Sequence, residues 1–115
     1  MLSLAAAVAL FYVIDGDTVV RDGVHIRIAN IDAPELRHAA CDKERRLAAV
    51  ARDRLRVLLD SGPVTIHLGD PNNGRLIDRF GRTLATLSVN GVDVGDVLVA
   101  EHLARFWTAP KRSWC

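Results

Sequence analysis

Apolar and polar residues alternate along residues 24–31, and this alternation predicts a β-strand with one buried face. Val24, Ile26 and Ile28 occupy the apolar face, while His25 and Arg27 occupy the polar face. Two more strands are expected before it, at residues 8–14 and 18–20. The Asp-Gly pair at residues 22–23 lies between two apolar runs and is typical of a tight hairpin turn.

A helical period follows over residues 42–59. Leu47, Ala51, Leu55 and Leu58 are spaced by four, four and three residues, which places them on one helix face. Gly62 and Pro63 come next and predict the end of this helix.

The second half of the chain predicts strands at residues 64–68 and 83–89, a turn at Asn90-Gly91, and a short helix at 94–101. Residues 103–115 show no clear period and are expected to be loosely structured. Short strands with tight turns and an inserted helix indicate a mainly β (α+β) fold. We expect a five-stranded OB-fold Greek-key barrel with about two helices packed on it.

The length of 115 residues is that of one domain, which we expect to span 1–115. Residues 1–7 are either the remainder of a targeting segment or disordered, and residues 106–115 are expected to form an irregular tail. The apolar start, MLSLAAAVALF, is too short to cross a bilayer.

The net charge of +1 gives no overall indication of nucleic-acid binding. Only Lys43 and Lys111 among the 15 basic residues are lysines, so 13 are arginines. Arginine forms forked hydrogen bonds to phosphates and carboxylates. Genome composition alone is the alternative explanation of this excess. The basic face of the 42–59 helix is either a solvated surface or a nucleic-acid contact.

The two cysteines, Cys41 and Cys115, lack the spacing of a zinc site. If bonded, they would stabilise the fold by about 4 kcal/mol and would indicate an oxidising compartment. Two unlinked thiols are the alternative.

Three short motifs carry the acids and arginines of interest. Asp15-Gly16-Asp17 interrupts an apolar strand, Asp32-Ala33-Pro34-Glu35 follows another, and Asp78-Arg79-Phe80-Gly81-Arg82 precedes a third. Each alone is typical of a turn. If the first strands form one sheet, their ends gather Asp15, Asp17, Asp32 and Glu35 at one rim.

Four neighbouring carboxylates repel each other unless a positive charge lies among them. A hard divalent cation with oxygen ligands meets this need, and so do Arg27 and Arg82. Together, these groups suit a phosphodiester substrate. The cation and the arginines would neutralise the charge developing on phosphoryl oxygens, and a carboxylate could take a proton from water.

These motifs, with VLVAEHLAR near the end, resemble the staphylococcal nuclease (thermonuclease) family over residues 11–105. The resemblance implies an OB-type barrel and calcium-dependent hydrolysis of DNA and RNA, cleaving P–O5′ bonds to leave 3′-phosphates. It implies one calcium ion held by Asp17, Asp32 and the carbonyl of Ala33, with Asp15 beside them. It also implies Glu35 as general base and Arg27 and Arg82 as the phosphate-binding pair.

Two positions depart from the family pattern. Trp107 lies where the family has nucleotide-binding tyrosines, so Trp107 and Arg79 are candidate substrate-binding residues. His102 replaces a usual glycine, and a left-handed backbone there would be strained. His25 is expected to be a solvated surface residue.

Two alternatives to a nuclease stay open: a non-catalytic nucleic-acid or protein binding module on the same fold, and a structural calcium site. The expected partner is single-stranded or unpaired DNA or RNA. We expect a monomer without a membrane partner, in a secreted or periplasmic location.

Overall fold

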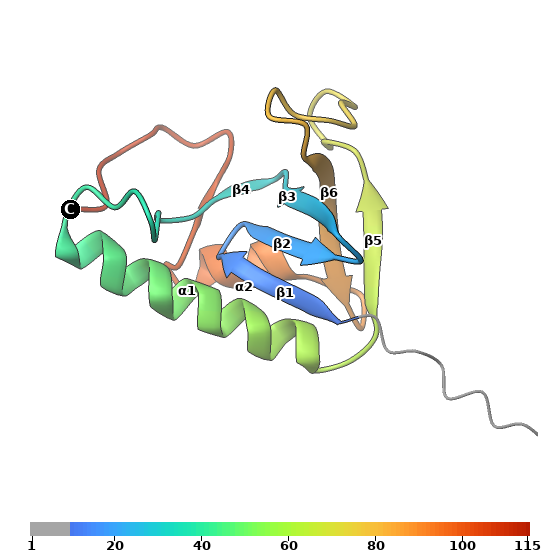
Figure 1. Ribbon diagram of the computed structural model, residues 1–115, viewed down its shortest axis with the longest axis horizontal. Coiled ribbons are helices and arrows are strands. Elements are labelled where there is room, and N and C mark those ends of the chain that lie inside the picture. The colour runs from blue at the N-terminus through green and yellow to red at the C-terminus, as the bar shows by residue number, and fades with distance from the viewer. Residues whose placement is uncertain (1–9) are drawn as a thin grey trace, which may run out of the picture.

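The computed structural model describes residues 10–115. The predictions for residues 1–7, and for a strand starting at residue 8, fall on residues outside this range. The described chain is mostly β-sheet with two helices, which confirms the predicted α+β class (Figure 1).

The main sheet is built from antiparallel hairpins joined by one parallel pair. Its strand order is β1-β2-β3-β6-β5, with the short β7 added on β6. The strand bounds are β1 Phe11–Asp15, β2 Thr18–Arg21, β3 Val24–Ile28, β5 Val64–Leu68, β6 Thr83–Val89 and β7 Val92–Asp93.

The parallel neighbours are β3 and β6, which pair Ile26 with Thr83 and Ile28 with Ala85. This order is consistent with an OB-like barrel. Among the described residues, no pairing joins β1 to β5, so the barrel is not closed by hydrogen bonds.

Both predicted glycine turns are present. Asp22 and Gly23 have φ of 49° and 77°, and Asn90 and Gly91 have φ of 52° and 79°. Two successive positive φ values are what a tight hairpin with the right-handed strand twist requires.

The predicted strand at residues 24–31 is wrong in its last part. After Ile28 the chain turns at Ala29 and Asn30 and enters β4 (Ile31–Asp32), which pairs with β8 (Arg105–Phe106). Before this turn β3 pairs with β6, and after it β4 pairs with β8. Residues 105–106 therefore form a strand. The expectation that residues 103–115 are loosely structured, with an irregular tail at 106–115, is wrong for these two residues.

Helix α1 (Asp42–Asp60) packs along β1, and α2 (Val94–Ala100) packs against β6 and α1 (Figure 1). The buried face of α1 is rotated from the predicted one. Ala51 and Leu55 are buried as expected, but Ala48 and Leu59 complete the face, while Leu47 and Leu58 are only partly buried.

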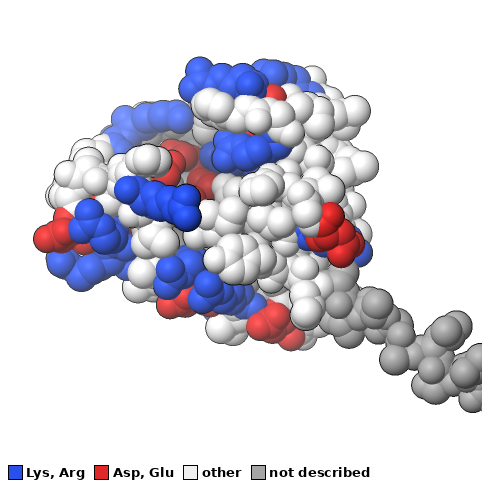
Figure 2. Space-filling model, viewed as in Figure 1, with Lys and Arg blue, Asp and Glu red and all other residues white. Residues whose placement is uncertain are grey.

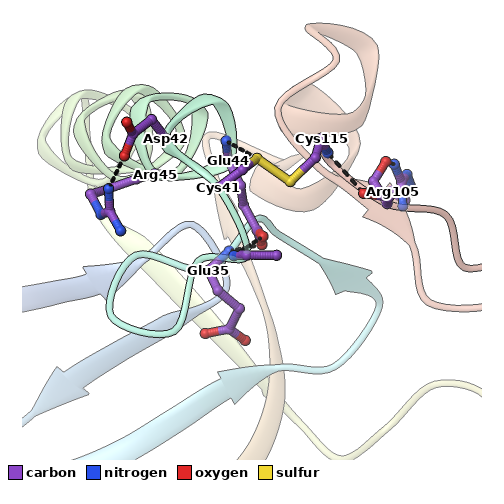
Figure 3. The surroundings of a disulfide bond; sticks show 9 residues. Glu35, Cys41, Asp42, Glu44, Arg45, Arg105 and Cys115 are labelled. Atoms are coloured by element: carbon purple, nitrogen blue, oxygen red, sulfur yellow. Dashed lines mark hydrogen bonds and ion pairs between the residues drawn. A yellow bond between two sulfur atoms is a disulfide. The ribbon is translucent and has the colours of Figure 1, made fainter.

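The end of the chain returns to the start of α1, where Cys115 is bonded to Cys41 (Figures 1 and 3). No helix within the described residues is both long and apolar enough to cross a membrane.

Candidate functional site

Gly16 lets the acidic turn between β1 and β2 lie directly against α1. A Cβ atom at Gly16 would be 2.9 Å from the Cβ of Ala51 and 3.0 Å from that of Ala33. Its φ is outside the left-handed region, so close packing, rather than an unusual bend, requires glycine here. The pairing of β1 with β2 also shifts register between Val13 and Asp15.

Asp17 is buried and holds the second motif in place. Its Oδ2 accepts a hydrogen bond of 2.8 Å from the backbone N–H of Ala33, and its Oδ1 accepts one of 3.0 Å from the hydroxyl of Thr18. The turn containing Asp17 is thus tied directly to the residue that follows Asp32.

Arg27 lies between the carboxylates of the first two motifs. Its Nη2 is 3.5 Å from Asp17 Oδ2 and 3.6 Å from Asp32 Oδ1. Its Nη1 donates to the carbonyls of Ile28 and Ile31, at 2.6 and 2.9 Å. Four contacts hold this guanidinium, so its position is set by the fold.

Burial and neighbouring charges raise the pKa values of three acids in this region, Asp15, Asp32 and Glu35. Burial, followed by the charge of Asp17, raises the pKa of Asp15 and of Asp32. Burial also raises the pKa of Glu35, and the charges of Asp17, Asp15, Asp32 and Glu44 add to this. Negative charge therefore exceeds what Arg27 neutralises.

This excess of carboxylate charge fits a hard cation, which prefers oxygen ligands. Arg27 Nη2 lies within 3.6 Å of both Asp17 Oδ2 and Asp32 Oδ1, so these two carboxylates lie close together, and the backbone N–H of Ala33 donates to Asp17. Within residues 10–115, however, no three His, Cys, Asp or Glu side chains form a group that could hold a metal ion. A hard cation at this place would therefore need oxygen ligands besides side-chain carboxylates, such as a backbone carbonyl.

Glu35 is positioned by a residue that the sequence patterns did not single out. The buried carboxylate of Glu44 in α1 accepts from the backbone N–H of Glu35 at 2.9 Å and from that of Ala40 at 2.8 Å. Cys41 caps the same helix, its sulfur accepting from the N–H of Glu44 at 3.4 Å. Figure 3 shows the Glu35 carboxylate pointing away from this anchored loop. An acid three residues after a helix cap resembles a capping box, the pattern that could have revealed Glu44.

Arg82 is oriented by Asp78. The Nε of Arg82 donates to Asp78 Oδ2 at 2.7 Å, and its backbone N–H donates to Oδ1 at 2.9 Å. Burial acts to raise the pKa of Asp78, but the hydrogen bonds from Arg82 and Phe80 lower it overall. Sequence reasoning missed this role, although the four-residue spacing within one turn pointed to it.

Two cavities meet at Arg82 and Phe80. The first, which we call the tryptophan cavity, has a volume of about 430 Å³ and is lined by Arg27, Arg79 and Trp107 among others. The second, which we call the hairpin cavity, has a volume of about 660 Å³ and is lined by Glu35, His25 and Val24 among others. Both include Phe80 and Arg82, so Arg82 lines one cavity together with Arg27 and the other together with Glu35.

Trp107 stands next to the phosphate-binding candidates. The guanidinium of Arg27 lies 5.4 Å from the centre of its ring, and the ammonium of Lys111 lies 4.0 Å from it. The backbone N–H of Trp107 donates to the carbonyl of Asn30 at 2.9 Å, next to β4. Pairing of β8 with β4 thus brings the end of the chain to the acids. On the face drawn in Figure 2, one group of acidic side chains is recessed between basic ones, while other acidic side chains lie at the surface.

The family model described as staphylococcal nuclease homologue matches residues 25–113. The chain belongs to this family. The matched residues include Arg27, Asp32, Glu35 and Arg82. Asp15 and Asp17 precede the match, and Asp17 is connected to the matched residues by its contacts with Arg27 and Ala33.

The chain is also similar to Protein ParB of Escherichia coli, with 37% identity over 82 residues. This match covers 68% of the chain and 39% of ParB, so the chain corresponds to less than half of that relative. The family resemblance found in the motifs is confirmed, and the fold is nuclease-like.

Proposed function

We propose that this protein is a calcium-dependent nuclease that hydrolyses phosphodiester bonds in unpaired DNA or RNA. One observation carries the proposal: Arg82 lines one cavity with Arg27 and the adjoining cavity with Glu35. A phosphate between the two guanidiniums would therefore have a carboxylate at hand on the side of the hairpin cavity. Family membership supports the same reaction.

Asp17, Asp32 and the carbonyl of Ala33 would hold the calcium ion, with Asp15 beside them. A bound ion would supply positive charge next to the phosphoryl oxygens. Since Arg27 also contacts the two carboxylates among these ligands, its guanidinium would keep them in place and share the neutralisation of their charge.

Arg27 and Arg82 would bind the non-bridging oxygens of the scissile phosphate. Guanidinium donors already in position stabilise the charge that develops when water attacks phosphorus. Glu35 would accept a proton from that water as the new P–O bond forms and the P–O5′ bond breaks. The 5′-oxygen then leaves with a proton taken from solvent, and the phosphate stays on the 3′-oxygen. Trp107 and Arg79 in the tryptophan cavity would contact the nucleotide next to this phosphate.

The proposal is tested by incubating the protein with single-stranded DNA in calcium and, separately, in excess chelator. We expect cleavage in calcium only. Glu35→Gln is expected to lose cleavage while keeping the fold, and Glu101→Gln, which changes an exposed ion-paired acid of similar size, is the matched control. If folded protein does not cleave in calcium, the proposal fails.

A binding module without catalysis is the second candidate. The observation that favours it is the ion pairing of Arg27 with both proposed calcium ligands, which balances part of their charge without a metal. This candidate predicts that oligonucleotides bind without turnover and that Asp17→Ala leaves their affinity unchanged. Under the nuclease proposal, Asp17→Ala abolishes the calcium dependence of both binding and cleavage.

A further inference from the structure

One covalent bond joins residues 107–115, which we call the strap, to the start of α1 (Figure 3). No residue of the strap is buried, and none lies in a helix or strand. Within residues 10–115, the hydrogen bonds of the strap beyond Trp107 all involve residues 105–115 themselves. Segments with so few buried contacts open locally at a small cost in free energy. The bond between Cys41 and Cys115 is therefore the main restraint that holds the strap against α1.

The strap carries one wall of the tryptophan cavity. Trp107 lines this cavity, and the guanidinium of Arg27 lies 5.4 Å from the centre of its ring. The ammonium of Lys111, farther along the strap, lies 4.0 Å from the centre of the same ring. Arg105 donates to two carbonyls near the far end of the strap, which closes the strap into a loop. The proposed nucleotide contact therefore belongs to a loop whose far end is fixed by the disulfide.

The disulfide is accessible at one cysteine and has a stabilised leaving group at the other. Cys115 is exposed, whereas Cys41 is partly buried and caps the 19-residue helix α1. The backbone N–H of Glu44 donates to the Cys41 sulfur at 3.4 Å. Hydrogen-bond donors at a helix N-terminus stabilise a thiolate, and a stabilised thiolate leaves more readily in thiol–disulfide exchange. Attack by a small dithiol at Cys115, with release of Cys41, is therefore the favoured direction.

We infer that the bond between Cys41 and Cys115 is a redox switch of substrate affinity, in which reduction by a dithiol frees the strap and with it Trp107. A thiolate of the dithiol attacks the Cys115 sulfur, the S–S bond breaks, and Cys41 leaves as a thiolate that takes up a proton. The second thiol of the reductant then displaces Cys115 and forms a cyclic disulfide. Two electrons and two protons pass from the reductant to the protein. The inference rests on the proposed nuclease function and extends it to regulation of the same site.

The proposed general base should stay in place when the strap is free. The side chain of Glu44 accepts hydrogen bonds from the backbone N–H groups of Glu35 and Ala40, and neither bond involves the strap. Cys41 also keeps its sulfur beside the N–H of Glu44 after reduction. Reduction should therefore raise KM and leave kcat unchanged, because it removes a substrate contact and not the catalytic groups.

The test compares oxidised protein with protein treated with dithiothreitol, with the released thiols counted by alkylation. The N–H of Trp107, which is bonded to Asn30, should exchange hydrogen faster after reduction. The N–H of Ala33, which is bonded to Asp17, should exchange at an unchanged rate. With single-stranded DNA in calcium, KM should rise by about tenfold, the loss of one stacked base. Glu35→Gln protein, used without turnover, should lose affinity for a short oligothymidylate by the same factor.

Three variants make the result specific. Protein with both Cys41→Ser and Cys115→Ser should behave as reduced protein and should not respond to the dithiol. Trp107→Ala protein should bind oligothymidylate weakly with its disulfide intact, and reduction should weaken binding no further. Tyr12, an exposed aromatic residue on β1 that lines neither cavity, provides the control: Tyr12→Ala should keep the full response to reduction.

Three results would overturn the inference. The dithiol could release no thiols from the folded protein, or complete reduction could leave oligothymidylate affinity and KM unchanged. Faster exchange at Ala33 together with Trp107 would show that the bond only supports global stability. Failure of the proposed function is distinct from all three, because the oxidised protein would then neither bind oligothymidylate nor cleave DNA, whichever way the amide exchange responds.

Discussion

The buried carboxylate of Glu44 accepts a 2.9 Å hydrogen bond from the backbone N–H of Glu35. Helix α1 thereby sets the position of the proposed general base through an acid that does not touch the substrate cavities. Glu44 is a positioning residue, and its hydrogen bonds from Ala40 and Glu35 lower its pKa.

Replacing Glu44 with Ala should destabilise the protein by about 2 kcal/mol, because two N–H groups lose a charged acceptor. Turnover should also fall while calcium affinity is kept, since the proposed calcium ligands lie outside the loop that Glu44 holds. Urea unfolding and a calcium titration measure these effects. Glu101→Ala, at an exposed ion pair with Arg54, is the control and should cost under about 1 kcal/mol.

The stabilisation from Glu44 should depend on pH. Its folded-state pKa lies below the unfolded value, so the contribution is present above the unfolded pKa of about 4.3 and is lost as pH falls through the folded value. The stability difference between wild type and Glu44→Gln should therefore shrink in acid. A difference that is constant from neutral pH to pH values below 4 would contradict this linkage.

Calcium binding should release protons at mildly acidic pH. Burial and neighbouring acids raise the pKa values of Asp32 and Glu35, so these carboxyls take up protons at a higher pH than ordinary acids do, and a cation favours their ionised forms. Calcium affinity should accordingly weaken as pH falls. Calorimetry in buffers of different ionisation enthalpy measures how many protons are released. Asp15→Asn should reduce the number of protons released, because removing this charge lowers the pKa of Glu35. Binding without proton release would count against a cation at these acids.

Asp78 and Arg82 should act as one unit. Arg82→Ala should lower kcat/KM by about 10²-fold, as expected for loss of one prepositioned donor. Asp78→Asn should lower it less, and the double variant should be no worse than Arg82→Ala alone, because Asp78 acts through Arg82. Arg56→Ala, at an exposed ion pair on α1, is the control. Strictly additive losses would show that Asp78 has another role.

The disulfide between Cys41 and Cys115 joins residues 74 positions apart. Replacing both cysteines with serine should lower the free energy of unfolding by about 4 kcal/mol in the chain-entropy description. Serine at position 41 keeps a hydrogen-bond acceptor where the Cys41 sulfur caps α1. The measured loss in the free energy of unfolding therefore reports the missing cross-link and not a missing helix cap. Denaturant unfolding with and without reductant provides the comparison, and the double variant should not respond to reductant.

His102 ends α2 in a left-handed conformation, with φ of 61°. The expected strain at this position is therefore present, and His102→Gly should stabilise the protein by about 1 kcal/mol. His38, which has no positive φ, is the control, and His38→Gly should be neutral or destabilising. Thermal unfolding of the two variants distinguishes a conformational effect from simple loss of an imidazole.

Local patterns in the sequence were sufficient to predict most elements and both glycine turns. Helix α1 begins at Asp42 as predicted and ends one residue later than predicted, at Asp60, and the Asp22-Gly23 and Asn90-Gly91 turns adopt positive φ. These features depend on backbone preference and on the periodicity of apolar residues, which are properties of short segments. The motif residues also pointed to one rim, because strand ends of a single sheet lie together.

Tertiary packing alone decided the features that connect distant residues. Three such features arise between separate elements. At Ala29 and Asn30 the chain stops pairing with β6 and begins to pair with β8. Gly16 packs against Ala51, and Glu44 anchors the backbone of Glu35. None of them has a local sequence preference strong enough to predict it, because each depends on how packing of the core places the elements side by side. The same packing placed Arg27 between Asp17 and Asp32, and so converted two turn motifs into one candidate site.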